Sequence, residues 1–326
     1  MSKPAEHYTT RLAPSPTGAL HLGNARSFLV TWALARKLGW RIVLRIEDLD
    51  GPRIKPESAA DIARTLAWLG MDWDGPTLTQ SDDLAPYAAA MGHLAKQGFC
   101  YPSEVSRSEL AAAASAPQAG SHEAIFPLSM RPADVGLPRV FDQPQINWRF
   151  ATPTTSSDAP SRVAFTDLVA GPQAIDTAST IGDFIIWTKR GTPAYQLAVV
   201  VDDHRQGITH IVRGDDLLNS AARQLLLYRA LGLGPEPVYA HLPLVVGLDG
   251  ARLAKRHGDS RVETYRAGGV AAERIIGLCA WWSGLQPGCA LPQPISAAEL
   301  VRLIDLAVMP KHPAVLTPEL EQWLSL

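Results

Sequence analysis

The first 50 residues contain a hydrophobic pattern typical of a strand, a turn, a helix and a second strand. Apolar residues recur at helical spacing over 24–38, and Gly39 is a typical helix terminator. Over 42–46 they alternate instead, and Val43 adds a second apolar face, which indicates a strand buried on both sides. The pattern therefore predicts a βαβ unit whose first turn lies at the carboxyl edge of a parallel sheet, where open α/β sheets bind ligands.

The same periodicities continue along the chain and predict an α/β fold. Further helices are expected over 57–70, 84–97 and 217–231. Strands over 184–187, 197–201, 208–213 and 241–246 are expected to continue a doubly wound sheet. Two stretches of small polar residues and proline, 111–121 and 152–161, are predicted loops of an inserted subdomain.

Composition narrows the class of protein. A chain of 326 residues, 46% of them hydrophobic, is long and apolar enough for one large or two ordinary domains. Its net charge of −2 gives no general attraction to nucleic acid, so binding RNA would need local basic patches. Cys100, Cys279 and Cys289 have no paired spacing, and no signal sequence or membrane span is evident. These features predict a cytoplasmic protein with no membrane partner.

Two segments carry candidate phosphate-binding chemistry. His21 and Gly23 begin the first helix, where free N–H groups and the helix dipole favour phosphate, and Gly23 leaves room for a nucleotide. Residues 252–258 form a basic loop in which Lys255 is suited to neutralise phosphate charge. Each signal is weak alone, because surface histidines and solvated basic turns are common.

Taken together, the segments RLAPSPTG, HLGN, LRIEDLD and RLAKRHG resemble, in order and spacing, the class I aminoacyl-tRNA synthetases. The likeness covers roughly residues 8–260 and is strongest to the catalytic half of glutamate–tRNA ligases. A full ligase continues into an anticodon-binding helical domain, which we do not expect here. In this respect the chain resembles the glutamyl-Q tRNA(Asp) synthetase family.

The resemblance implies a class I synthetase fold: a Rossmann-type doubly wound parallel sheet with an inserted acceptor-type subdomain and a short helical C-terminal region. The first half of the Rossmann domain is expected at 1–98 and the inserted subdomain at 99–180. The second half, with a KMSKS-like loop, is expected at 181–260, and the C-terminal helices at 261–326.

The resemblance also implies the site. The residues that match the family's glutamate pocket are Arg11, Ala13, Ser15, Glu47, Tyr195 and Arg213. Those that match its ATP site are His21, Gly23, Asn24, Arg252 and Lys255, with His21 and Lys255 as the catalytic candidates. Arginine suits a carboxylate because its planar fork donates to both oxygens. Structural ion pairs near the strand ends are the alternative for Arg11, Glu47 and Arg213. The loop departs from the family, because Arg252 and Ala254 replace its usual lysine and serine.

The inserted subdomain departs from the family in its metal chemistry. Relatives without the anticodon-binding domain often hold zinc there, and the four corresponding positions are Ser103, Val105, Phe126 and Met130. None of these is a good zinc ligand. We therefore predict no metal site and no zinc, and expect ATP with its bound Mg²⁺ as the only cofactor.

The implied function is ATP-dependent activation of L-glutamate without tRNA, followed by transfer to the queuosine base in the anticodon stem-loop of tRNA(Asp). A local phosphate-binding patch is expected from Lys189, Arg190, Arg252, Arg256, Arg261 and Arg266. No obligate protein partner is evident. Two alternatives stay open: a shortened glutamate–tRNA ligase that charges a tRNA 3′ end, and a catalytically silent paralogue with a binding role. The intact His21, Lys255 and Arg213 argue against the silent paralogue.

Overall fold

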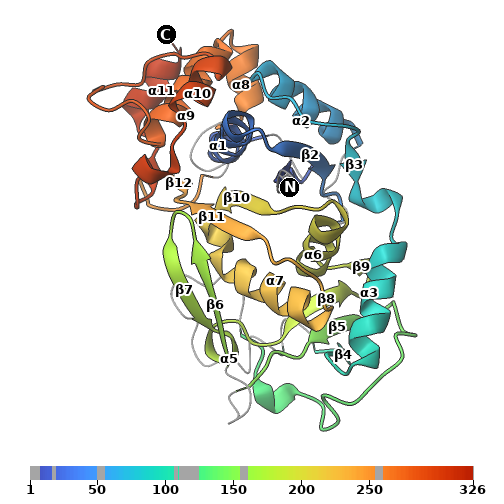
Figure 1. Cartoon of the computed structure of the whole chain (residues 1–326). Helices are drawn as coiled ribbons and strands as arrows, with labels where there is room; N and C mark the ends of the chain where they lie inside the picture. The colour runs from blue at the N-terminus through green and yellow to red at the C-terminus, as the bar shows by residue number, and fades with distance from the viewer. Residues whose placement is uncertain are drawn as a thin grey trace, which may run out of the picture.

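A parallel sheet crosses the middle of the molecule (Figure 1). The computed structural model describes residues 8–16, 20–49, 56–105, 109, 125–154, 161–253 and 260–325. Strands β1 (Thr9–Leu12), β2 (Arg41–Ile46) and β3 (Leu78–Thr79) pair in that order, all parallel. Strand β10 (His210–Gly214) pairs in parallel with β11 (Val238–Leu242). The N–H of Thr209 donates to the carbonyl of Thr9 (2.9 Å), which places β10 beside β1 and gives the order β3-β2-β1-β10-β11.

Helices cover both faces of this sheet. One face carries α1 (Leu22–Leu38), α2 (Pro56–Trp68), α8 (Val262–Ala267), α9 (Ala272–Trp282), α10 (Ala297–Leu303) and α11 (Pro318–Ser325) (Figure 1). The other carries α3 (Ala85–Lys96), α6 (Tyr195–Arg205) and α7 (Leu218–Ala230). Ile42 and Leu44 belong to the first hydrophobic core, and Val43 belongs to the second. The prediction of a strand buried on both sides is confirmed.

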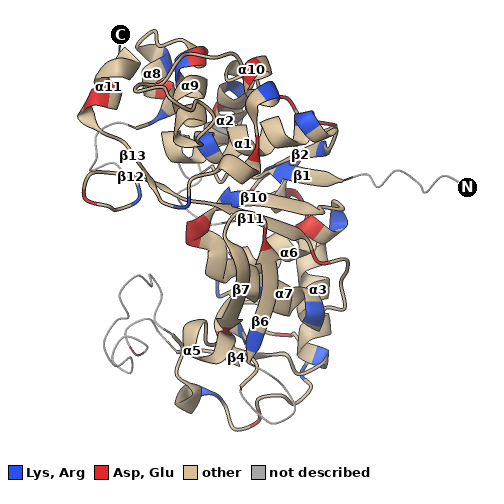
Figure 2. Cartoon of the chain, turned by 60° about the vertical axis from the view of Figure 1, so that its left-hand side comes forward, with Lys and Arg blue, Asp and Glu red and all other residues tan. Residues whose placement is uncertain are grey.

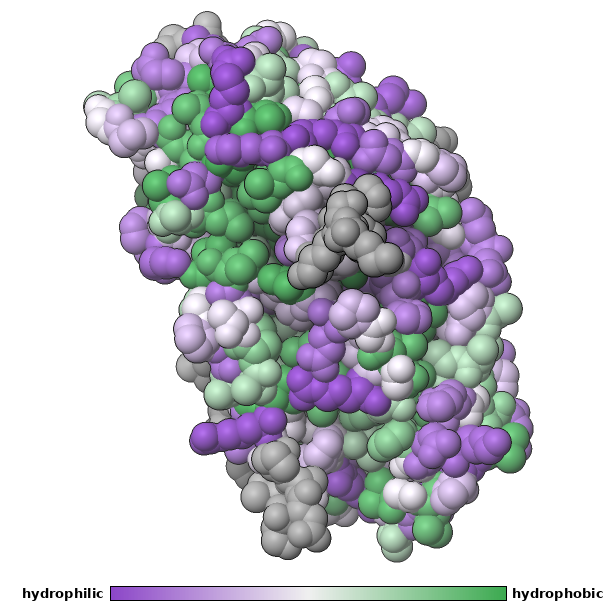
Figure 3. Space-filling view, viewed as in Figure 1, coloured by the Kyte–Doolittle hydropathy of each residue, from purple (hydrophilic) through white to green (hydrophobic). Residues whose placement is uncertain are grey.

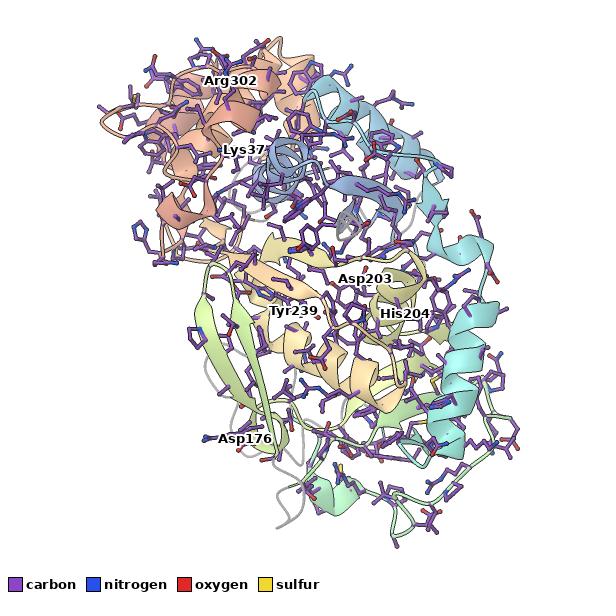
Figure 4. The ribbon with its side chains drawn as sticks, viewed as in Figure 1. Lys37, Asp176, Asp203, His204, Tyr239 and Arg302 are labelled. Atoms are coloured by element: carbon purple, nitrogen blue, oxygen red, sulfur yellow. The ribbon has the colours of Figure 1, made fainter. Side chains whose placement is uncertain are left out.

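The first helix ends where the sequence predicts. Gly39 adopts the left-handed conformation (φ 69°) and its N–H donates to the carbonyl of Ala35, as glycine at a helix C-terminus commonly does. Lys37, in the last turn, donates from Nζ to the carbonyls of Ile304 (2.6 Å) and Arg302 (3.3 Å) at the end of α10. Figure 4 shows Lys37 and Arg302 next to each other at this junction. The C-terminal helices are thereby tied to α1.

The inserted subdomain contains an antiparallel sheet of its own. Its strands β4 (Cys100–Ser103), β5 (Asn147–Phe150), β8 (Phe184–Thr188) and β9 (Thr192–Pro193) pair in that order. The strand predicted at 184–187 therefore exists, but it pairs with β5 and does not extend the parallel sheet. A hairpin of β6 (Arg162–Asp167) and β7 (Gly171–Asp176) adds to β11, and the short α5 (Thr177–Thr180) follows it.

The strand predicted at 197–201 is wrong, because these residues lie inside α6. All five are buried, and Leu197, Ala198, Val200 and Val201 belong to the second hydrophobic core. A short continuous apolar run fits a buried strand and a buried helix equally, so periodicity could not separate the two.

Smaller elements complete the fold. They are β12 (Val245–Val246), β13 (Ala314–Val315) and the 3₁₀ turns Gln80–Asp82, Leu128–Met130, Asp215–Leu217 and Leu306–Val308. The parallel pairing of β12 with β13 joins the C-terminal region to the loop after β11. Hydrophobic residues gather in this part of the space-filling view (Figure 3). Within the described ranges, no helix is long and apolar enough to span a bilayer.

Candidate active site

A cavity of about 350 Å³ opens at the carboxyl ends of β1, β2 and β10. Its lining includes the predicted residues Arg11, Ala13, Ser15, His21, Gly23, Asn24, Glu47, Tyr195, Arg213 and Arg252. From β1 the chain continues into α1 on one face of the sheet, and from β10 it continues into α7 on the other. The cavity therefore lies at a topological switch point, the usual ligand site of open α/β sheets. The remaining predicted residue, Lys255, lies outside the described residues.

The N-terminus of α1 faces the cavity. His21 is the N-cap residue; among the described residues no side chain accepts a hydrogen bond from this end of the helix, and the first turn contains no acidic residue. Gly23 and Asn24 line the cavity in this turn. A Cβ atom on Gly23 would lie 3.6 Å from Cβ of Val245, an ordinary contact. Packing within the protein therefore does not require a glycine at this position. A ligand that came close to the backbone of this turn would require one. The arrangement suits a phosphate.

The segments flanking the basic loop are attached to the cavity. On one side, Nη1 of Arg252 forms an ion pair with Oδ2 of Asp216 at 2.6 Å. On the other, the Oγ atom of Ser260 lies 3.0 Å from Nδ1 of His21, and its carbonyl accepts the N–H of Leu22 (3.0 Å). His21 is therefore held by the segment that follows residues 254–259.

Buried charges surround the inner end of the cavity. The guanidinium of Arg45, whose side chain is 1% exposed, donates to Oε1 of Glu47 (3.0 Å) and to Oδ1 of Asp203 (2.8 Å). Burial raises the pKa of Glu47, although the positive charges of Arg45 and Arg11 oppose the shift. Figure 4 shows Asp203 on α6, beneath the sheet.

Two buried arginines at this end lack a full complement of partners. The nearest carboxylate to Arg11 is Asp203, with Nε and Oδ1 3.6 Å apart, and this Nε has no hydrogen-bond partner in the described part of the chain. Arg213 has three partners among the described residues, all uncharged: His241, Gln224 and the carbonyl of Leu217. Both side chains are only 6% exposed. Buried cations need a counter-charge, and here a ligand would supply it.

Three guanidinium groups, those of Arg11, Arg45 and Arg213, lie at this end together with the carboxyl groups of Glu47 and Asp203. Such a set can bind carboxylates through the arginines and an ammonium group through Glu47. Tyr195, the first residue of α6, also lines the cavity, and burial together with the charge of Glu47 raises its pKa.

Sequence reasoning missed several residues that hold this site. Arg45 stands in the segment LRIEDLD but received no role, and His241, Gln224 and Asp167 were not singled out. Each of these residues is polar and buried in a helix or strand. The hydrophobic pattern of the sequence predicts the helix or strand but not which side chain a buried polar residue contacts. The structure also places Asp203 between Arg11 and Arg45.

Comparison with known proteins agrees with this geometry. Residues 7–290 match the model of the family described as tRNA synthetases class I (E and Q), catalytic domain. A glutamyl-Q tRNA(Asp) synthetase of Symbiobacterium thermophilum is 43% identical over 320 residues, which are 95% of this chain and 96% of that protein. The chain belongs to this family. It is accordingly a class I synthetase, a ligase with the α/β fold that the sequence predicts.

Other members of the family extend the comparison. A glutamyl-Q tRNA(Asp) synthetase of Rhodopirellula baltica is 45% identical over 85% of this chain and 85% of that protein. A glutamate–tRNA ligase of Dinoroseobacter shibae is 39% identical over 83% of this chain but only 55% of that protein. The crystal structure of a glutamate tRNA ligase from Elizabethkingia meningosepticum, in complex with its amino acid, superposes with a TM-score of 0.77 at 26% identity, over 98% of this chain and 69% of that one.

Proposed function

We propose that this synthetase activates L-glutamate with ATP in the absence of tRNA and then transfers it to the queuosine base of tRNA(Asp). The observation that carries the proposal is the charge of the cavity. Arg213 has only uncharged hydrogen-bond partners among the described residues, and Arg11 shares the single carboxylate of Asp203 with Arg45, next to the N-terminus of α1. Glutamate supplies the missing negative charge, and the helix N-terminus suits the phosphates of ATP.

In the first step, the cavity holds the amino acid. Arg11 and Arg213 take its carboxylates, Glu47 takes its ammonium group, and the segment containing Ala13 and Ser15 closes the pocket with Tyr195. The α-carboxylate attacks the α-phosphorus of ATP, and pyrophosphate leaves. No protein nucleophile is needed, so positioning and charge stabilisation supply the catalysis.

The ATP site uses the other half of the cavity. His21, Gly23, Asn24 and Arg252 line it around the N-terminus of α1. We assign to Lys255 the neutralisation of charge that develops on the leaving pyrophosphate. Mg²⁺ enters bound to ATP, as class I synthetases use it in general.

In the second step, a hydroxyl of the queuosine cyclopentenediol attacks the carbonyl carbon of the glutamyl adenylate, and AMP leaves. The names of the relatives from Symbiobacterium and Rhodopirellula support this acceptor. Bases in an anticodon loop are unstacked and can enter a pocket, whereas the stem is recognised by its shape.

The test has two parts. Pyrophosphate exchange into ATP should depend on glutamate and need no tRNA. Labelled glutamate should then appear on tRNA(Asp) that contains queuosine and not on the same tRNA without it. An absence of exchange would favour the silent paralogue. Exchange followed by labelling of the terminal adenosine of tRNA(Glu), with none on queuosine, would identify a shortened glutamate–tRNA ligase.

A further inference from the structure

Three buried polar side chains from neighbouring strands form a chain of hydrogen bonds that ends in the cavity. Oδ2 of Asp167 on β6 lies 2.6 Å from Nδ1 of His241 on β11. Nε of Arg213 on β10 donates to Nε2 of His241 at 3.0 Å. The side chains of Asp167 and His241 are fully buried, and Arg213 is 6% exposed.

The chemistry of arginine fixes the protons along this chain. A guanidinium has no acceptor, so Nε2 of His241 must carry no proton and accept from Arg213. The single proton of the neutral imidazole is then on Nδ1 and is donated to Asp167. Asp167 also accepts the N–H groups of Val169 (2.9 Å) and Ala170 (2.7 Å), which fix its carboxylate.

We propose that Asp167 and His241 are positioning residues that orient Arg213 toward a carboxylate of the bound glutamate. This inference rests on the proposed function and deepens it. The guanidinium of Arg213 has five N–H groups. His241, Gln224 and the carbonyl of Leu217 each take one of them, on Nε, Nη1 and Nη2 respectively.

The count of donors explains why the orientation matters. Two N–H groups are left, one on each terminal nitrogen, and a carboxylate bound by both oxygens needs two parallel donors. Loss of the acceptor at His241 frees Nε–H. The guanidinium can then turn and present a different pair of donors to the ligand, so the substrate loses a fixed partner although Arg213 is still present.

The arrangement also predicts a dependence on pH. The charged and titratable groups facing His241 among the described residues are Asp167 on β6, Arg213 on β10 and Tyr239 on β11, whose ring stacks at 5.7 Å. Burial and the charge of Arg213 lower the pKa of His241, whereas Asp167 opposes this shift. Protonation would convert Nε2 from acceptor to donor beside a cation. Because the pKa of His241 is lowered, the acceptor is present at neutral pH and is lost only as the solution becomes acidic.

The test compares His241→Phe, which removes the acceptor, with His241→Gln, which offers an uncharged oxygen that does not titrate. His210→Gln is a matched control, because His210 begins β10 at the end opposite Arg213.

Glutamate and ATP KM and kcat are measured by pyrophosphate exchange between pH 5.5 and 8.5. We expect His241→Phe to raise the glutamate KM about 10-fold or more, the usual cost of a lost hydrogen bond to a charged group, with the ATP KM unchanged. The wild-type glutamate KM should rise at acidic pH, and that rise should be smaller in His241→Gln, where Glu47 still titrates in the pocket, than in the wild type or in His210→Gln.

The outcomes separate this inference from the proposed function. A wild-type chain without glutamate-dependent exchange would overturn the proposed function and the inference with it. Normal wild-type exchange with an unchanged glutamate KM in His241→Phe would overturn the inference alone, as would an acidic rise in His241→Gln as large as in the wild type. If His241→Phe does not fold, the pH profile of His241→Gln decides.

Discussion

Arg11 and Arg213 occupy similar positions at the ends of adjacent strands but have different partners. Arg11 shares the carboxylate of Asp203 with Arg45. Oδ1 of Asp203 lies 3.6 Å from Nε of Arg11 but 2.8 Å from Nη1 of Arg45, so the ion pair of Arg11 is the weaker one. Arg213 has uncharged partners in the described part of the chain. Burying such cations costs stability unless a ligand compensates them. We therefore expect both to bind a ligand rather than to form structural ion pairs.

Replacing either arginine should weaken glutamate recognition selectively. Arg11→Ala or Arg213→Ala leaves a buried substrate carboxylate without its partner, which costs about 3–5 kcal/mol, or more than about 100-fold in the glutamate KM. The ATP KM should change little. Pyrophosphate exchange at varied glutamate and ATP measures both constants. Unchanged glutamate dependence in both variants would place the amino acid elsewhere.

Gly23 allows a separate test of the ATP site. Since its Cβ would meet Val245 only at 3.6 Å, Gly23→Ala should fold normally, with stability unchanged or higher by up to about 1 kcal/mol. The added methyl group intrudes where a nucleotide must approach, so we expect the ATP KM to rise about 10-fold, as for an overpacked site. Thermal unfolding and exchange kinetics check the two halves of this expectation. A normal ATP KM would show that no phosphate approaches this turn.

The motifs could locate the residues that line the cavity but not those that hold them. His21, Glu47 and Arg213 stand in short segments whose order and spacing are distinctive. Asp167 and His241 are 74 residues apart and meet only because β6 adds to β11. A single buried histidine in a strand has no periodic signature, so its partner emerges only from the paired strands.

At the scale of elements, long periodic segments were predicted well and short apolar runs were not. The helix over 24–38 and its glycine terminator are confirmed, because its pattern covers four turns and ends in a residue with a defined backbone preference. For 184–187 the predicted strand exists but pairs in a different sheet, and for 197–201 the predicted strand is a helix. Which sheet a strand joins depends on partners distant in sequence, and this cannot be read from the strand itself.

One carboxylate organises the inserted subdomain. Oδ2 of Asp183, a fully buried side chain, accepts from Oη of Tyr101 (2.5 Å) and Nε of Arg131 (2.7 Å), and Oδ1 accepts the N–H of Thr152 (2.8 Å). These partners come from β4, from the segment after Met130 and from the segment after β5. A single anion thereby joins three parts of the subdomain that the sequence leaves far apart.

Neutralising this carboxylate should destabilise the subdomain strongly. Asp183→Asn leaves Arg131 without its counter-ion, and breaking a buried pair costs about 3–5 kcal/mol. Asp176→Asn is a matched control, because Asp176 caps α5 at the surface and asparagine caps equally well. Urea unfolding followed by tryptophan fluorescence measures both. Equal stabilities would mean that Asp183 is compensated in another way.

Two of the four positions at which zinc ligands are missing, Ser103 and Phe126, belong to the same core. Ser103 accepts from Nε of Arg149 (3.2 Å), and the guanidinium of Arg149 lies 4.1 Å over the ring of Phe126. Phe126 and Tyr101 are buried, whereas Phe99 is 39% exposed. The described residues contain no cluster of three or more metal-ligating side chains.

We therefore keep the prediction that the protein binds no structural zinc. Hydrogen bonds and packing around Arg149 hold this part of the subdomain together. We therefore expect that a chelator does not change the unfolding midpoint of the protein. Elemental analysis of tag-free protein should give much less than one zinc per chain. One tightly held zinc per chain would contradict the prediction.

At the scale of the whole molecule, charge is dispersed. Lysine and arginine are interspersed with acidic residues over the elements in Figure 2, consistent with the net charge of −2. Of the six cations expected to form one patch, the four in the inserted subdomain and near α8 lie in two separate places. Lys189 and Arg190 follow β8 in the inserted subdomain, whereas Arg261 and Arg266 belong to the region of α8, on the other face of the sheet (Figure 1). Arg256 lies outside the described residues. Net charge from sequence could not reveal this separation.

The dispersed charge bears on the size of the RNA that is recognised. An enzyme without a large basic surface gains little from a whole tRNA, but it can hold one compact stem-loop through a few phosphate contacts near the cavity. We therefore expect an isolated queuosine-bearing anticodon stem-loop of tRNA(Asp) to be glutamylated nearly as well as the full tRNA, and removal of the 3′ CCA end to have no effect. This is measured by comparing labelled glutamate on the two RNAs at equal concentration and over 50–200 mM salt.

Two double variants, Lys189→Ala/Arg190→Ala and Arg261→Ala/Arg266→Ala, then show which group of cations contacts the phosphates. Only the variant that loses phosphate contacts should have a weaker salt dependence. If the full tRNA reacts and the stem-loop does not, contacts outside the anticodon arm are required, and a single compact recognition site is excluded.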